Sequence, residues 1–315
     1  MAFAYDRFSP FEIGPTLLSG GKLYQLDNHM GQASYNEALR LYAEYHGADD
    51  GRIQCMMGPF APDFISEKML VKCKDAAADK GLPIQMHTAQ GDRETEQMEM
   101  RYKKRTIPYL DEHEYLDPEF TAVHMTMANN DEVHQVAEAG SKLVVCNGSI
   151  GLIDGMIPPA IPFQEAGGTV GLGSDQAAGN NNCNVFNEMK LTAFFGKMRN
   201  QDPTAMPADR VLRMATIDGA KALGLESEIG SLEVGKKADL ILVDTRHPTL
   251  QPVIEEPFNL TANLVYAARG NEVSFVMIDG RVVLSDGKLQ TMDQDAVIRE
   301  IRDGVPNRRK KVGFM

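Results

Sequence analysis

Short apolar segments alternate with longer amphipathic segments through most of the chain. Consecutive apolar positions predict strands at 52–59, 83–87, 121–124, 142–147 and 169–175. Between these runs, helices are predicted by apolar spacing, charged composition or terminal Asn and Gly residues at 34–45, 65–81, 91–116, 129–140, 184–198 and 209–225. Strands that are apolar on successive positions and alternate with helices are typical of a parallel sheet covered on both faces.

The pattern changes after Leu225. A turn and a strand are predicted within 229–244, and two further strands within 273–289 are joined by Asp279-Gly280, a strong two-residue hairpin signal. This pattern predicts a small all-β module. We therefore expect an α/β domain over residues 1–228 and a C-terminal β module with a tail over residues 229–315.

Composition narrows the class of protein. The 315 residues are 43% hydrophobic, enough for a large core, and the net charge of −12 argues against a nucleic acid or an anionic membrane as partner. The N-terminal residues lack the apolar region of a signal peptide, and no run approaches the ~20 apolar residues of a membrane span. Four cysteines without a Cys-x-x-Cys pair favour free thiols and a cytoplasmic location. The basic residues 308–311 are expected to form a solvated tail.

Four successive predicted strands end on polar residues, namely His87, His124, Asn147 and Asp175. In a parallel βα arrangement these ends lie on one face, where active sites form. Two histidines and an aspartate have the composition of a zinc or ferrous iron site. Each residue alone has a structural explanation, as a hydrogen-bonded histidine or a turn residue. The coincidence of four strand ends favours a functional site.

Several motifs carry a resemblance to a known family. The segments PIQMHTAQ, TAVH, GLGSDQAAGNNN and IGSLEVGKKADLILVD resemble the amidohydrolase superfamily, in the branch of methylthioadenosine/S-adenosylhomocysteine deaminase and the triazine hydrolases. The resemblance implies a distorted (β/α)8 barrel beside a β-sandwich. The fold expected here is α/β, an incomplete (β/α)8 TIM-type barrel with a small C-terminal β-sandwich portion.

The resemblance also implies roles for the strand-end residues. His87 would be a metal ligand, Asp175 would bind the metal and take a proton from water, and His124 would hold that water or polarise the substrate. Asn147 would contact the substrate. The implied cofactor is one divalent metal, with zinc favoured over iron. The implied reaction is hydrolysis of a non-peptide C–N bond, or dechlorination, of a purine-, pyrimidine- or triazine-like ring. A homodimer is expected as well.

Two further positions bear on the chemistry. Gln90 stands where deaminases of this branch carry glutamate, so it is expected to contact substrate, but it cannot shuttle a proton to leaving ammonia. This leaves room for an alkylamine or halide as leaving group. Glu94 or Glu96 could take over the proton transfer, but both are expected to be helix-surface charges. The asparagines at 180–182 are expected to cap the following helix rather than contact substrate.

The sequence departs from the family pattern in one important way. The family carries His-x-His at the end of its first strand, and no such motif occurs in the 315 residues. Five or six strands are predicted where a closed barrel needs eight. We therefore expect a chain equivalent to the C-terminal two-thirds of a longer protein. The alternative function is an inactive amidohydrolase-like fragment or scaffold. Nucleotide binding through Gly171-x-Gly173 is disfavoured because the third glycine of that fingerprint is absent.

Overall fold

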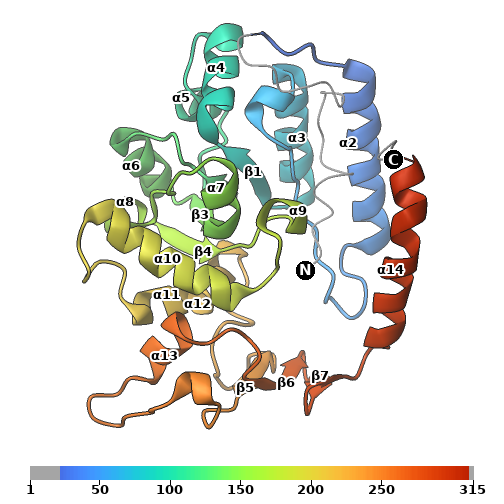
Figure 1. Ribbon diagram of the computed structural model, residues 1–315. Coiled ribbons are helices and arrows are strands. Elements are labelled where there is room, and N and C mark those ends of the chain that lie inside the picture. Colours follow the sequence, from blue (N-terminus) through green and yellow to red (C-terminus); the bar gives the residue numbers. More distant parts are fainter. Residues whose placement is uncertain (1–21, 312–315) are drawn as a thin grey trace.

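A four-stranded parallel sheet lies at the centre of the molecule (Figure 1). The computed structural model describes residues 22–311, the side chains of 305–311 excepted. The strands follow the order β1-β2-β3-β4, so each crossover moves one position in the same direction, as in a (β/α) barrel. This confirms the predicted α/β fold class. The strands are β1 (Ile84–Thr88), β2 (Phe120–His124), β3 (Lys142–Val145) and β4 (Thr169–Leu172).

The register of the sheet brings the strand ends to one edge. Thr88 at the end of β1 lies beside His124 at the end of β2, and Val145 lies beside Leu172 in the same way. Because all four strands are parallel, the residues that follow them gather at this carboxyl edge.

Helices cover the sheet and connect its strands. The helix α12 packs against β4, α8 packs against α6 and β4, and α10 packs against α7. Their bounds are α2 (Asn28–Tyr45), α3 (Glu67–Lys80), α4 (Gly91–Tyr102), α5 (Thr106–Glu112), α6 (Asn130–Glu138), α7 (Asn147–Ile153), α8 (Ala160–Glu165), α9 (Ala177–Asn180), α10 (Val185–Asn200), α11 (Ala208–Met214) and α12 (Ile217–Ala222), with a 3-10 turn at Pro62–Phe64.

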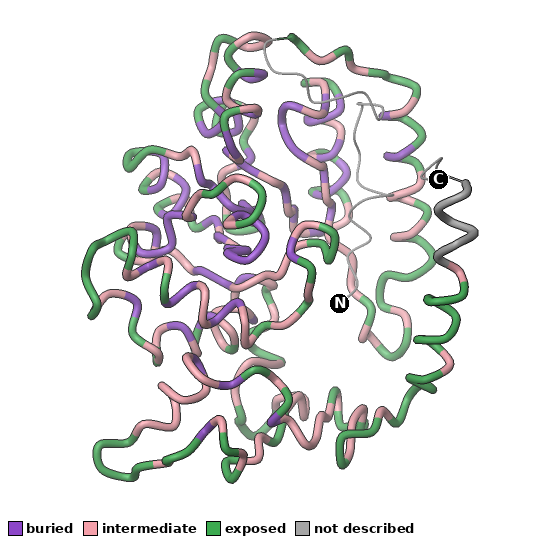
Figure 2. Tube along the Cα trace, viewed as in Figure 1, coloured by how far each residue is buried: buried purple, intermediate pink, exposed green. Residues whose placement is uncertain are grey.

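Burial is concentrated around this sheet (Figure 2). Every residue of β2 is buried, and Met86, Phe120, Leu143 and Val170 are fully enclosed. Burying a side chain such as Phe120 contributes roughly 2–3 kcal/mol. The rigid sheet fixes the directions in which the strand-end residues point.

The C-terminal part forms a second, antiparallel sheet of order β5-β6-β7-β8. The predicted hairpin is confirmed, since Asp279 and Gly280 have φ of 50° and 74°, the positive values that its two-residue turn requires. A helix between β5 and β6, α13, packs against α10 and α11. The bounds are β5 (Leu240–Val243), a 3-10 turn (Pro248–Leu250), α13 (Leu260–Tyr266), β6 (Val273–Ile278), β7 (Arg281–Ser285), β8 (Lys288–Leu289) and α14 (Gln294–Lys311).

Three predicted elements were wrong. The predicted helix 91–116 is two helices, α4 and α5, and α4 ends at its cap Lys103, whose φ of 55° is left-handed. The segment 52–59 pairs with the sheet only as an isolated bridge between Met57 and Ile84, because Pro59 has no N–H to extend the ladder. The predicted helix 209–225 is two helices, α11 and α12. At the break the Thr216 hydroxyl donates to the carbonyl of Leu212 at 2.7 Å, and Thr216 itself leaves helical geometry at φ −127° and ψ −104°.

The remaining expectations about the termini fall partly outside the described residues. The N-terminal segment 1–21 lies outside them. Residues 308–311 belong to α14, and only their backbone is described. Within the described part of the chain, the helices are all too short or too polar to cross a membrane.

Candidate functional site

Three of the predicted site residues come together at the carboxyl edge of the sheet. The Nε2 atom of His124 lies 3.8 Å from Oδ2 of Asp175. The rings of His87 and His124 stack with centroids 5.3 Å apart and planes 13° from parallel. His124 ends β2 as predicted, whereas His87 is the penultimate residue of β1 and Asp175 follows the end of β4 at Leu172 by three residues. The fold thus joins groups that are up to 88 residues apart in sequence (175 minus 87).

The backbone of this cluster adopts left-handed conformations. The φ angles of His124, Met125 and Asp175 are 77°, 52° and 59°, and Ala89 near His87 has φ of 50°. Non-glycine residues adopt these values only a few per cent of the time, at a cost of about 1 kcal/mol or more each. Backbone strain of this kind is concentrated at functional sites.

His124 is completely buried at the centre of this cluster. Burial, and next the neighbouring His87, lower its pKa to about 3, while the Asp175 carboxylate opposes this shift. The ring is therefore neutral at physiological pH, and its contact with Asp175 is not an ion pair. Neither ring nitrogen has a hydrogen-bond partner among the residues that the structure describes. A buried imidazole left in this state suits an additional polar ligand, such as water or a metal ion.

The orientation of His87 is fixed by Phe60. Its Nδ1 donates a hydrogen bond of 2.8 Å to the Phe60 carbonyl, and the two rings pack with centroids 4.8 Å apart. A carbonyl can only accept, so in the neutral ring the lone pair resides on Nε2. Hydrogen bonds of this type orient histidines that ligate metals. Phe60 was not among the site residues predicted from the sequence.

The Asp175 carboxylate is held by two donors. Its Oδ2 accepts from the Ser149 hydroxyl at 2.6 Å, and its Oδ1 accepts from the backbone N–H of Gln176 at 2.6 Å. The side chain is 16% exposed. Asp175 can therefore meet solvent or a ligand on the side that these donors leave uncovered.

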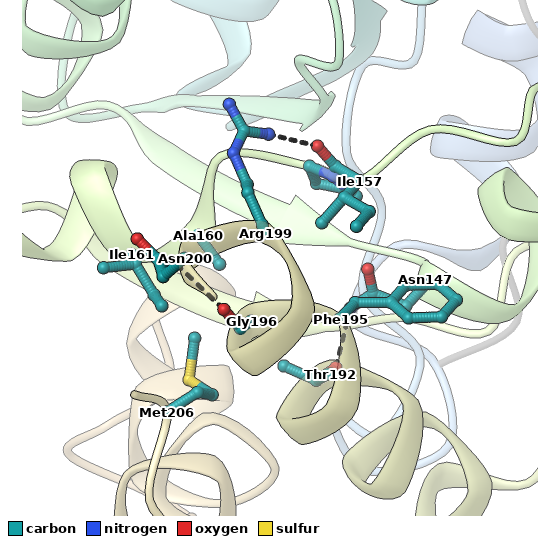
Figure 3. A pocket seen from close by; sticks show the side chains of 11 residues that line it. Asn147, Ile157, Ala160, Ile161, Thr192, Phe195, Gly196, Arg199, Asn200 and Met206 are labelled. Carbon is teal, nitrogen blue, oxygen red and sulfur yellow. Dashed lines mark hydrogen bonds between the residues drawn. The ribbon is translucent and has the colours of Figure 1, made fainter. Parts of the chain in front are cut away.

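Asn147 differs from the prediction because it does not end a strand. The strand β3 stops at Val145, and Asn147 is the first residue of α7. Its amide donates to the Thr192 hydroxyl on α10 at 2.7 Å, at the wall of a small pocket (Figure 3). None of His87, His124 and Asp175 lines that pocket. The contact of Asn147 with substrate remains a prediction.

Gln90 lies at the same edge and contacts a different helix. Its Nε2 donates to Oδ2 of Asp154 at 3.4 Å, and Asp154 follows the last residue of α7. The Asp154 carboxylate thus stands beside the side-chain amide of Gln90.

The expectation that Glu94 is a surface charge was wrong. Its side chain is fully buried and accepts hydrogen bonds from the backbone N–H groups of Ala89 and Gln90 at 2.7 and 2.9 Å, and from the Thr106 hydroxyl at 2.5 Å. Burial, reinforced by the nearby Asp63, raises its pKa to about 7. Glu94 therefore secures the turn that follows His87. By contrast, Glu96 is exposed, as expected.

The expected cap at 180–182 was also wrong. The cap of α10 is Asn184, whose side chain accepts from the N–H groups of Phe186 and Asn187. Asn180 is buried instead, and its amide donates to the carbonyl of Ser174 and to Glu188.

Imidazole and carboxylate groups suit a divalent metal, and the unpartnered nitrogens of His124 agree with an ion or its bound water nearby. Across residues 22–311, however, no three His, Cys, Asp or Glu side chains are grouped closely enough to hold a metal.

The chain is similar in sequence and in structure to known deaminases. The chain is 36% identical over 263 residues to 5-methylthioadenosine/S-adenosylhomocysteine deaminase from Moorella thermoacetica, covering 84% of this chain and 60% of that protein. The structure of an adenosine deaminase from Xanthomonas campestris with bound zinc matches with a TM-score of 0.84 and 30% identity, covering 89% of this chain and 62% of that one.

Atrazine chlorohydrolase from Arthrobacter aurescens, complexed with zinc, has the same fold. Its TM-score is 0.79 at 20% identity, over 93% of this chain and 63% of that one. The chain thus spans 60–63% of the length of these three relatives. The family model described as "Amidohydrolase family" matches residues 6–283. The chain belongs to the amidohydrolase family.

Proposed function

We propose that these residues form part of a metal-dependent site that hydrolyses a non-peptide C–N bond on a heterocyclic ring. Water replaces the exocyclic amine, and ammonia is released. The observation that carries this proposal is the buried, neutral His124, whose two unpartnered nitrogens lie beside the Asp175 carboxylate. The names of the relatives make an aminated purine nucleoside the first substrate to test.

The chemistry of the side chains supports a division of roles. Asp175 accepts the proton of the attacking water, since its carboxylate is anchored by two donors yet partly accessible. With a pKa of about 3, His124 does not supply a charged acid at neutral pH, so it acts by hydrogen bonding to the water or to the ring. His87 offers Nε2 as a ligand. A divalent metal bound there would lower the pKa of its water toward neutrality.

The identity of the leaving group depends on the chemistry of Gln90. An amide cannot deliver a proton to departing ammonia, whereas a halide leaves without one. The carboxylate that contacts the side-chain amide of Gln90 is that of Asp154, at 3.4 Å. We place amine hydrolysis first and dechlorination second.

The setting of the site completes the proposal. Zinc is favoured over iron because two of the solved relatives contain zinc. The four cysteines are unpaired, which supports a cytoplasmic location. We further propose that the protein forms a homodimer. Within each chain, residues 1–228 and residues 229–315 form two structural units.

Ammonia release tests the function directly. The purified chain is loaded with zinc and incubated with adenosine, methylthioadenosine or an aminated triazine, with a chelator-treated sample as control. The expected result is zinc-dependent ammonia release from at least one ring. Absence of ammonia from every substrate, with zinc bound, would contradict the proposal for this chain.

The second candidate is a non-catalytic amidohydrolase-like scaffold. It is favoured by the absence of three grouped metal-binding side chains within residues 22–311. Elemental mass spectrometry of the desalted chain separates the two candidates. Near-zero zinc after loading supports the scaffold, and about one zinc per chain supports the hydrolase.

A further inference from the structure

The hydroxyl of Ser149 contacts the candidate site from inside the protein. Its side chain is completely buried, and Oγ donates to Oδ2 of Asp175 at 2.6 Å. This is the same oxygen that lies 3.8 Å from Nε2 of His124. Ser149 therefore holds the carboxylate oxygen that faces the histidine.

The other hydrogen bond of this carboxylate cannot fix its orientation relative to the sheet. Its donor is the N–H of Gln176, the next residue in the chain, so the bond moves with the loop itself. Ser149 lies on α7, a separate element. Of these two bonds, only the one from Ser149 ties the Asp175 side chain to another element.

The start of α7 is itself locked in place by Glu188. This buried carboxylate accepts from the N–H of Gly148 at 2.9 Å and from the amide of Asn180 at 2.8 Å. The same Asn180 amide donates to the carbonyl of Ser174, next to Asp175, at 2.6 Å. One carboxylate thus connects the helix that carries Ser149 with the loop that carries Asp175.

There is little room for this arrangement to shift. A Cβ atom on Gly148 would lie 2.3 Å from Oδ1 of Asn180 and 2.5 Å from Oε1 of Glu188, so only glycine permits this approach. Close packing around a buried hydrogen bond keeps the donor at a fixed position.

We propose that Ser149 is a positioning residue, which directs the Asp175 carboxylate toward His124 and is itself positioned by Glu188 and Asn180. The role of Asp175 in catalysis rests on the proposed function, whereas the positioning of its carboxylate does not. Partners of this kind typically contribute 10- to 100-fold to activity or metal affinity.

Crystal structures of the full chain with Ser149→Ala and Ser174→Ala test the positioning. Ser174 is the matched control, because its hydroxyl donates to the backbone carbonyl of Asp175 at 3.3 Å and not to the carboxylate. We expect S149A to turn the carboxylate away from His124 and S174A to leave it in place. An unchanged carboxylate in S149A overturns the proposal, whether or not the chain is active.

Kinetics then separate this proposal from the proposed function. With ammonia release as readout, S149A should lower kcat roughly 10- to 100-fold with little change in KM, and Ser149→Thr, which keeps the hydroxyl, should restore it. A moved carboxylate in a chain whose wild type is inactive supports the positioning and counts against the proposed function. Should S149A fail to fold, Ser149→Cys is examined in the same way, because a thiol is only a weak donor.

Discussion

His124 and Asp175 approach to 3.8 Å although the strands that carry them, β2 and β4, are separated in the sheet by β3. The left-handed backbone at both residues accompanies this approach. His and Asp are among the residue types that tolerate such φ values best. Histidine and aspartate at these two positions therefore serve the contact twice: they tolerate the left-handed backbone, and they supply the interacting groups.

Asp175→Asn should remove activity and keep the fold. Asparagine tolerates φ of 59° as well as aspartate does, and its amide oxygen can still accept from Ser149. Without a carboxylate to take the proton of water, ammonia release should fall roughly 10²- to 10⁴-fold. The thermal unfolding midpoint should change little. Turnover close to that of the wild type would remove Asp175 from the proposed mechanism.

Glu94 should make the stability of the protein fall as pH rises. Its pKa in the folded protein is about 7, above its ordinary value of 4.5. In the unfolded chain the group loses its proton first, so stability is fully present below pH 4.5 and is lost as pH rises through about 7. The loss is roughly 3 kcal/mol. The raised pKa of Asp63, about 6, adds a contribution of the same sign.

Glu94→Gln tests this pH dependence. Urea unfolding between pH 4 and 8 should show a shallower decline for Glu94→Gln than for the wild type, with the contribution of Asp63 remaining. Glu96→Gln is the matched control, because Glu96 is exposed on the same helix. Equal slopes for Glu94→Gln and the wild type would show that Glu94 titrates normally.

Gln90→Glu should increase amine hydrolysis. The new carboxylate would stand beside Asp154, and two neighbouring carboxylates share a proton, which raises the pKa of one toward neutrality. The site would then hold an acid able to protonate the leaving amine. The measurement is ammonia release against pH, compared with Gln90→Glu combined with Asp154→Asn. If no aminated ring is hydrolysed faster by Gln90→Glu, Gln90 does not occupy the proton-shuttle position.

Asn184→Ala should destabilise the protein by about 1–2 kcal/mol. The side chain caps α10, and it also donates to the carbonyl of Arg269 at 2.6 Å, which ties α10 to the chain before β6. Thermal or urea unfolding measures the loss. The control is Asn181→Gly, since Asn181 is exposed and glycine accepts its φ of 62°. Equal stability of Asn184→Ala and the wild type would argue against this cap.

Local sequence was enough to place much of the framework. The strand and helix periods predicted β1 to β4, and parallel topology alone implied that His87, His124 and Asp175 share one edge. The hairpin at Asp279-Gly280 was equally predictable, because its turn chemistry involves only neighbouring residues.

Tertiary structure decided the surroundings of the site. Glu94 lies in a charged helical sequence that is indistinguishable from a surface segment, and only the turn at Ala89 and the hydroxyl of Thr106 make it a buried acceptor. Ser149 carries no sequence signal at all, because its partner Asp175 is 26 residues away and reaches it only through the fold. Hydrophobic period and turn residues depend on contacts between near neighbours, so the sequence located the carboxyl edge of the sheet. Long-range packing determined which side chains hold the site residues in position at that edge.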